Sequence, residues 1–225
     1  MHPIEFTKND LKNRIDAILE EEIIHNKGSY NFDTPYQTYE RIDYIGRRWS
    51  VEKRIEEYGL DSLCQANSKI LDIGSNFGFF TVELAIRCEL AHGVEWNPYL
   101  NRIGRLTAEH LGLTDEAVFF NSTFDDFVSD IKYDLILSMA SFYTEDGKER
   151  VSSNEYFRKV RGLLSSKGHL FYESTSYIPD TNDPFEDAMM AASESISKEL
   201  RIVTQWESKT GSQGGHRKFI IASRN

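Results

Sequence analysis

Two carboxylates and two glycines stand at a spacing that suits the binding of a nucleoside. Asp72, Gly74 and Gly78 form the pattern Asp-x-Gly-x-x-x-Gly directly after a short apolar run. Glu95 follows about 20 residues later, at the end of the next predicted strand, where nucleotide-binding units place an acid for the ribose. A carboxylate accepts several hydrogen bonds, so it suits the two neighbouring hydroxyls of a ribose.

The residues around this pattern predict a strand, a tight loop and a helix. Ile70–Ile73 is a short apolar run, typical of a strand that is covered on both faces. The two glycines allow a ligand to approach the backbone, and a helix starting at Phe79 would direct free N–H groups at the loop. A lone Gly-x-x-x-Gly is also common in ordinary strand-to-helix turns. The position of Glu95 favours the nucleoside interpretation.

The loop is not the dinucleotide pattern G-x-G-x-x-G. It resembles motif I of the class I S-adenosylmethionine-dependent methyltransferases, an acid followed by three glycines at alternate positions. Asn76 replaces the middle glycine, as in some members of that group. The resemblance implies a methyltransferase (EC 2.1.1.-) with S-adenosyl-L-methionine as cofactor and S-adenosyl-L-homocysteine as product. Asp72 and Glu95 would be its motif I acid and its ribose-binding acid.

The same resemblance implies further contacts with the methyl donor after the third and fourth strands, and a lid before the loop would add Tyr36, Gln37 and Arg54. Thr123 stands where the family usually has an Asp for the adenine amine, and its hydroxyl is a weaker acceptor. A helix N-cap is an equally good role for it. The predicted donor-binding residues are Tyr36, Gln37, Arg54, Asp72, Gly74, Ser75, Asn76, Phe77, Gly78, Glu95, Trp96, Thr123, Phe124, Ser138 and Met139.

Strands and helices alternate from residue 67 onward, which predicts a parallel sheet with helices on both faces. Two C-terminal strands joined by a Gly/Ser-rich turn resemble the antiparallel last strand of methyltransferases. The predicted fold is therefore α/β: a Rossmann-like, seven-stranded methyltransferase sheet over residues 67–225, after an N-terminal helical lid over residues 1–66. The expected strands are 70–73, 91–95, 117–121, 133–138, 169–173, 201–206 and 218–222. The expected helices are 9–26, 51–58, 79–89, 98–111, 123–127, 153–164 and 185–200, with a turn at 167–168.

The segment from residue 30 to residue 49 is rich in aromatic side chains and precedes the core. These rings either pack the first two helices onto the domain or form a lid that closes the donor site. Doubly wound sheets bind ligands at the carboxyl ends of their strands, so a preceding segment has to supply the missing wall. This argument favours the lid.

A hydroxyl acceptor needs a general base, whereas an anionic acceptor needs cationic clamps. The candidate catalytic residues are Glu173, Tyr143 and His216. Glu173 closes the fifth strand at the expected edge, and a buried salt bridge is its alternative role. His216 and Arg217 lie on the C-terminal hairpin, where such a pair is more often solvated.

Two features of the sequence narrow the chemistry. The loop Ser138–Tyr143 contains no proline, whereas enzymes that methylate nucleic-acid bases often carry a proline-containing loop there. The chain also lacks the cluster of acids that metal-dependent methyltransferases use, so we expect no metal.

Composition limits the remaining classes of function. The chain has 225 residues, a formal net charge of -10 and a pI of about 5.1, and this acidic balance argues against nucleic acid as a partner. Cys64 and Cys88 provide neither a disulfide framework nor a metal site. No apolar run is long enough for a membrane span, and the first residues lack a signal core. We expect a cytoplasmic protein; its oligomeric state is not predicted.

Several short features resemble the methyltransferase module of bacterial polysaccharide chain-terminating enzymes. They are Tyr36-Gln37 before an arginine-bearing helix, Gly-Phe-Phe after the loop, a glutamate closing the fifth strand, and a final Ala-Ser-Arg-Asn. This resemblance implies O-methylation of a carbohydrate, a sugar phosphate or another small polar acceptor. The alternatives are an RNA or protein methyltransferase, or a protein that binds a nucleoside without turnover. The glycine spacing argues against a nicotinamide dehydrogenase.

Overall fold

The structure, a computed structural model, describes residues 6–25, 35–142, 151–179, 182–210 and 215–224. These residues form two compact units. The first unit contains the chain up to Asn67 together with Ser75–Ser122, and the second contains Ser68–Gly74 together with the chain from Thr123 onward. The boundary expected after residue 66, between a lid segment and a core domain, stays a prediction.

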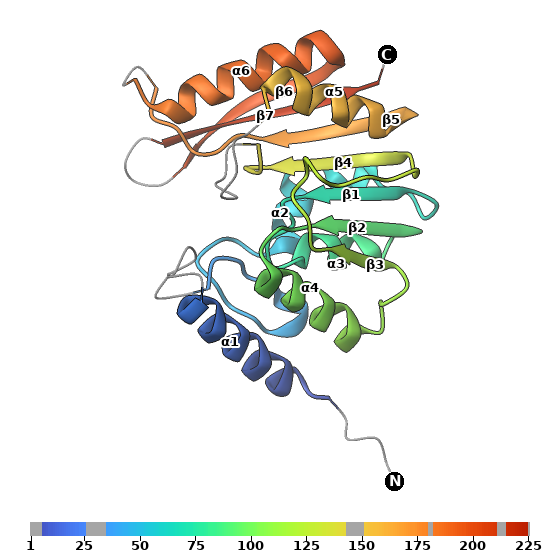
Figure 1. The fold of residues 1–225 in the computed structure, drawn as a ribbon, viewed down its shortest axis with the longest axis vertical. Helices are drawn as coiled ribbons and strands as arrows, with labels where there is room; N and C mark the ends of the chain where they lie inside the picture. Colours follow the sequence, from blue (N-terminus) through green and yellow to red (C-terminus); the bar gives the residue numbers. More distant parts are fainter. Residues whose placement is uncertain (1–5, 26–34, 143–150, 180–181, 211–214, 225) are drawn as a thin grey trace. The chain divides into compact units, whose positions relative to one another are not determined.

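Within the described part of the chain, seven strands form a sheet in the order β3-β2-β1-β4-β5-β7-β6 (Figure 1). In the first unit β2 pairs with β3 in parallel, and in the second β4 pairs in parallel with both β1 and β5. β7 runs antiparallel to β5 and to β6. The predicted α/β methyltransferase sheet with an antiparallel last strand is confirmed. The strands are β1 (Lys69–Ile73), β2 (Leu90–Val94), β3 (Ala117–Phe120), β4 (Tyr133–Met139), β5 (Leu164–Glu173), β6 (Arg201–Thr210) and β7 (Gly215–Ser223).

A side chain caps the N-terminus of most of the described α-helices. Ser50, Asn97, Ser152 and Asp183 each accept a hydrogen bond from a backbone N–H of the first turn, which satisfies a donor that the helix itself leaves unpaired. The α-helices are α1 (Lys8–His25), α2 (Val51–Glu57), α3 (Phe79–Ala85), α4 (Pro98–Leu111), α5 (Ser153–Leu163) and α6 (Pro184–Glu199). Two short 3-10 helices, which the sequence did not predict, are η1 (Glu40–Ile42) and η2 (Leu60–Leu63).

Three local predictions are wrong. Thr123–Phe127 is a single turn and not a helix, because the Thr123 hydroxyl bonds Asp126 and closes the turn locally. Lys167 and Gly168 lie inside β5 and do not form a turn. There the pairing with β4 shifts register, and a Cβ at Gly168 would lie 2.7 Å from the Tyr133 carbonyl oxygen. Helix α3 ends at Ala85, four residues earlier than expected.

In the first unit, aromatic rings attach the N-terminal segment to the start of α3. Tyr39 and Tyr44 are fully buried. Their ring centroids lie 5.2 and 5.8 Å from that of Phe79, within the usual range for aromatic pairs. Packing is therefore one role of this segment, and the lid stays a prediction.

A buried carboxylate on α3 adds charge to this attachment. The Glu83 side chain is 1% exposed, and it accepts hydrogen bonds from Tyr39 Oη (2.8 Å), from Arg41 Nε (2.7 Å) and from Arg87 Nη2 (2.6 Å). Burial raises the pKa of the Glu83 carboxyl, but the hydrogen bonds from Arg41 and Tyr39 and the charges of Arg41 and Arg87 outweigh it. The net effect holds the pKa below its ordinary value of 4.5. Glu83 therefore stabilises the fold in its ionised form.

Three glycines of the first unit surround one phenylalanine. A Cβ at Gly78, Gly93 or Gly104 would lie 2.5, 2.8 or 2.6 Å from the Phe119 ring. These distances are far shorter than any ordinary contact between carbon atoms. Phe119 on β3 thus packs directly on the backbones of the glycine loop, of β2 and of α4.

In the second unit, α6 lies along β6 and β7 and also packs against α5 (Figure 1). Aromatic rings from β5, β6 and β7 pack together in this unit. Trp206 and Phe219 stack with ring centroids 5.1 Å apart, and Phe171 lies beside both. No helix in the described residues is long and apolar enough to cross a membrane.

We predict that Glu83→Gln lowers the free energy of unfolding by about 2 kcal/mol at pH 7, less than for a fully buried pair because both arginines remain partly in water. Urea denaturation at several pH values measures this. Since the folded-state pKa is depressed, the difference from wild type should be present above pH 4.5 and vanish as the pH falls further. Glu194→Gln, at an exposed ion pair on α6, is the control and should change little. A pH-independent difference would contradict the charge argument.

We also predict opposite effects of the same substitution in two helices. Gly104→Ala in α4 should destabilise by about 1–3 kcal/mol, because the new methyl group collides with Phe119. Gly162→Ala in α5 should be neutral or stabilise by up to about 1 kcal/mol, because no atom lies within 4 Å of the new Cβ and alanine favours the helix. Urea denaturation of both variants checks the pair, and equal effects would rule out the proposed packing on Phe119.

Candidate functional site

The loop between β1 and α3 has an unusual backbone. Gly74, Asn76 and Gly78 all have positive φ angles, of 68°, 56° and 73°. Asparagine tolerates this left-handed region better than most residues with a side chain. The Asn76 side-chain oxygen also accepts the N–H of Phe77 at 2.9 Å. Asn76 therefore keeps the turn that a glycine would allow at this position.

Glu95, at the end of β2, is held by two backbone donors. Its Oε2 accepts the N–H of Asn76 at 2.9 Å, and its Oε1 accepts the N–H of Asn97 at 2.9 Å. The residue is 4% exposed. These two bonds, one to each carboxylate oxygen, orient the group. The predicted ribose acid is thus adjacent to the glycine loop and fixed in direction.

Two more residues of the first unit that are predicted to contact the methyl donor have buried polar atoms. Ser75 is 3% exposed and Gln37 is 6% exposed. The Ser75 hydroxyl oxygen and Gln37 Oε1 have no hydrogen-bond partner among the described residues. An unpaired buried polar atom costs free energy, so each favours a ligand group that would satisfy it.

The remaining predicted contacts of the first unit already have protein neighbours. Arg48 donates to Tyr36 Oη at 3.2 Å and lies over its ring. The Arg54 guanidinium lies 4.7 Å from the centre of the Phe80 ring. Phe77 is buried against other aromatic rings, and Trp96 is half-buried.

In the second unit, the start of the loop is closely packed. Asp72 lies in β1 and is 2% exposed. A Cβ at Gly74 would lie 2.7 Å from the Cβ of Ser141, so only glycine fits there. The loop after β4 thus lies directly against the first glycine of the predicted motif.

Ser138, at the end of β4, belongs to a cluster of three hydroxyl groups. Tyr156 Oη lies 2.9 Å from Ser138 Oγ and 3.3 Å from Ser141 Oγ, and the two serine oxygens are 3.1 Å apart. Tyr156 was not among the predicted site residues, because it lies on α5, far from β4 along the chain. Met139, the last residue of β4, is half-buried.

Thr123 and Phe124 follow the first unit directly. Thr123 bonds Asp126, as described above. Phe124 packs edge-on against Tyr156, with centroids 4.8 Å apart, and its carbonyl oxygen accepts from Lys159 Nζ at 2.6 Å. These contacts fix the turn in which both residues lie.

Glu173, the last residue of β5, forms a buried ion pair. Its Oε1 lies 2.8 Å from Nη1 of Arg217, and the two side chains are 1% and 9% exposed. Arg217 Nη1 also donates to the carbonyl oxygen of Ser174 at 3.0 Å. The expectation that Arg217 is solvated is wrong: β7 places it beside the end of β5, a pairing that short-range sequence patterns do not reveal.

Among the described residues, no hydrogen bond or ion pair joins the candidate catalytic residue His216 to Glu173. His216 Nδ1 lies 3.8 Å from Glu207 Oε2, and the His216 backbone pairs with Tyr177. Tyr143 lies outside the described residues.

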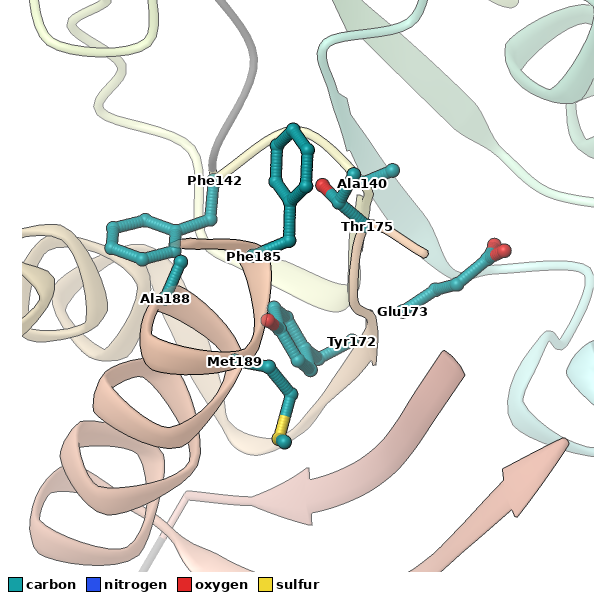
Figure 2. Close-up of a pocket in the computed structure, with 8 residues that line it drawn as sticks. All are labelled: Ala140, Phe142, Tyr172, Glu173, Thr175, Phe185, Ala188 and Met189. Atoms are coloured by element: carbon teal, nitrogen blue, oxygen red, sulfur yellow. The ribbon is translucent and has the colours of Figure 1, made fainter. Parts of the chain in front are cut away.

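A small cavity lies at the ends of β4 and β5, beside the first turns of α6 (Figure 2). Its volume is about 10 Å³, room for roughly one water molecule. Most of its walls are apolar, and the buried hydroxyl of Thr175 has no partner in the described structure. Figure 2 shows the Glu173 carboxylate pointing away from Phe185 and Met189. The lining residues are Ala140, Phe142, Tyr172, Glu173, Thr175, Phe185, Ala188 and Met189.

Residues 6–142, without 26–34, and the described residues from 151 onward contain no group of three His, Cys, Asp or Glu side chains that could hold a metal ion. The expectation that the reaction needs no metal stays a prediction.

Comparisons with known proteins show the fold. No protein-family model and no curated protein sequence matches this chain. Solved structures do match. The N-methyltransferase NodS from Bradyrhizobium japonicum WM9, in complex with S-adenosyl-L-homocysteine, superposes with a TM-score of 0.60 at 17% identity over 94% of this chain and 98% of NodS.

Two further methyltransferase structures have the same fold. Geranyl diphosphate C-methyltransferase from Streptomyces coelicolor A3(2) gives a TM-score of 0.61 at 13% identity, over 77% of this chain and 79% of that one. A TehB-like SAM-dependent methyltransferase from Corynebacterium glutamicum gives 0.55 at 17% identity, over 95% and 100%. At these identities the likeness concerns architecture alone: the chain has the fold of these methyltransferases.

Proposed function

We propose that this chain is an S-adenosylmethionine-dependent methyltransferase that methylates an oxygen atom of a small polar acceptor, such as a carbohydrate or a sugar phosphate. One observation carries the proposal: the Glu95 carboxylate lies beside the glycine loop, oriented by the N–H groups of Asn76 and Asn97. The shared fold supports it, because NodS was crystallised with S-adenosyl-L-homocysteine.

The residues of the loop fit the donor. Glu95 would accept hydrogen bonds from the two ribose hydroxyls, because a carboxylate oxygen can accept more than one. Ser75 and Gln37 would supply a hydroxyl and a carbonyl oxygen that have no partner among the described residues. These three contacts with the methyl donor are predictions, as are those of Tyr36, Arg54, Asp72, Gly74, Asn76, Phe77, Gly78, Trp96, Thr123, Phe124, Ser138 and Met139.

The donor supplies a methyl group on a positively charged sulfur, which is already activated for displacement. The protein therefore has to align the acceptor, exclude water and remove one proton from a hydroxyl acceptor. Glu173 would accept that proton through its carboxylate, and Arg217 would keep the carboxylate in place through the 2.8 Å ion pair. Glu173 would then be the catalytic residue and Arg217 a positioning residue.

The preference for a small polar acceptor rests on the sequence resemblance alone. The cavity at the ends of β4 and β5 has a volume of only about 10 Å³, so it does not itself hold a sugar ring. The resemblance to polysaccharide chain-terminating O-methyltransferases and the cytoplasmic location remain part of this proposal.

We predict that Glu95→Gln weakens binding of S-adenosyl-L-homocysteine at least about tenfold, because the amide NH₂ would face one of the two backbone N–H donors and also lose acceptor capacity for the ribose. Isothermal titration calorimetry measures the dissociation constant. Asp115→Asn removes the same charge at an exposed position and is the control. Equal affinity of the Glu95→Gln variant and wild type would refute the site, and binding of NAD in place of the sulfur nucleosides would refute the class.

We predict that Glu173→Gln lowers kcat by about 10²-fold while the dissociation constant of the donor stays within about twofold, since a general base acts only in the chemical step. The assay measures S-adenosyl-L-homocysteine formed with the best acceptor from a screen of sugars and sugar phosphates. Because the substitution also breaks a buried ion pair, urea denaturation has to show that the variant is folded at the assay temperature. Unchanged kcat in a folded variant would leave Glu173 only a structural role.

A further inference from the structure

A buried carboxylate interrupts the apolar face of α1. Leu11, Ile15 and Ile18 recur at helical spacing and are buried, and Glu22 continues the same stripe one turn later. Glu22 is 0% exposed. Burial of a carboxylate costs several kcal/mol unless hydrogen bonds compensate it. A charged residue at this position therefore indicates a specific partner in the interior of the first unit.

That partner is Asn97, the residue that caps α4. Asn97 Nδ2 donates to Glu22 Oε1 at 3.2 Å, and both residues are fully buried. The side-chain oxygen of Asn97 accepts the N–H groups of Tyr99 and Leu100 at 2.9 and 3.3 Å. These two bonds fix the orientation of the amide, so its NH₂ group has to point away from α4. Glu22 is the acceptor that receives it.

Asn97 also connects Glu22 to Glu95. The backbone N–H of Asn97 donates to Glu95 Oε1 at 2.9 Å. The side chain and the backbone of one residue thus bond two carboxylates, one on α1 and one at the end of β2. A change in the position of Asn97 would move one of the two donors that orient the Glu95 carboxylate.

A second, outer set of contacts joins the same two helices. Glu21, next to Glu22 in the chain, pairs with Arg102 at 2.6 Å, and these side chains are 47% and 50% exposed. His25 stacks on Tyr99 with ring centroids 5.9 Å apart. These contacts hold α1 beside α4 without touching Glu95. A substitution in this outer set therefore tests the packing of α1 on α4 without changing the buried hydrogen bond between Glu22 and Asn97.

We propose that Glu22 and Asn97 are positioning residues that set the orientation of Glu95 toward a ribose diol, so that α1 is part of the donor site. The proposal rests on the ribose-binding role of Glu95 in the proposed function. It assigns to the N-terminal helix a contribution to ligand selectivity: a preference for nucleosides that carry both the 2′ and the 3′ hydroxyl.

The test uses two ligands that differ only in the diol, adenosine and 2′,3′-dideoxyadenosine, titrated by calorimetry into the full chain. Glu22→Ala should weaken binding of adenosine by about tenfold and leave binding of 2′,3′-dideoxyadenosine unchanged. Glu22→Gln should keep most of the affinity, because its carbonyl oxygen can still accept from Asn97 Nδ2. Glu21→Ala, the neighbouring residue of the same type, should change neither ligand.

Asn97→Asp provides a second variant if Glu22→Ala folds poorly. Aspartate caps a helix as well as asparagine does, but it cannot donate to Glu22 and it repels that carboxylate. It should reproduce the selective loss of adenosine affinity.

The outcomes distinguish the two proposals. If Glu22→Ala and Asn97→Asp lose affinity equally for adenosine and 2′,3′-dideoxyadenosine, or lose affinity for neither, the positioning role alone is overturned. A wild-type protein that binds both ligands equally would overturn the ribose role of Glu95, and the positioning role with it.

Discussion

The organisation of the first unit depends on one carboxylate that accepts two backbone N–H groups. Glu95 joins the loop after β1, through Asn76, to the start of α4, through Asn97. Neither loop has a regular element to satisfy these donors, so the carboxylate replaces a backbone partner for both. The group that would bind a ribose is thus also the group that holds the surrounding loops. Binding and local folding share the same acceptor, which leaves the site oriented before a ligand arrives.

Charge and aromatic packing attach the N-terminal segment in a similar way. Glu83 accepts hydrogen bonds from Tyr39, Arg41 and Arg87, and the rings of Tyr39 and Tyr44 pack against Phe79 at the start of α3. The aromatic composition of this segment indicated packing or a lid. The contacts attach the described part of this segment, residues 35–49, to α3, and its role in closing the site remains a proposal.

The sequence predicted the regular elements well because their signals are local. The strand–loop–helix around Gly74, the capped helix at Pro98 and the antiparallel last strand follow from spacing and turn residues. The errors arose where a neighbour decides the structure. The extension of β5 through Gly168, the turn closed by Thr123, and the burial of Arg217 beside Glu173 depend on residues that are distant in the sequence or on side-chain bonds. Glu22 did carry a signal, a charged residue on the apolar stripe of α1, but its hydrogen bond with Asn97 is visible only in the structure.

The ring of Phe119 has a consequence for how this sequence can change. It lies against the backbones of Gly78, Gly93 and Gly104, and each of these glycines would collide with it if it gained a side chain. A larger residue at Gly93 or Gly104 would need a smaller residue at position 119, so substitutions at these positions should occur together in related proteins. A smaller residue at 119 would not be enough at Gly78, where a new Cβ would also lie 2.8 Å from the Gly104 Cα and φ is 73°. Gly78, which ends the glycine loop, is thus also constrained by Phe119 on β3, a residue that has no predicted contact with the methyl donor.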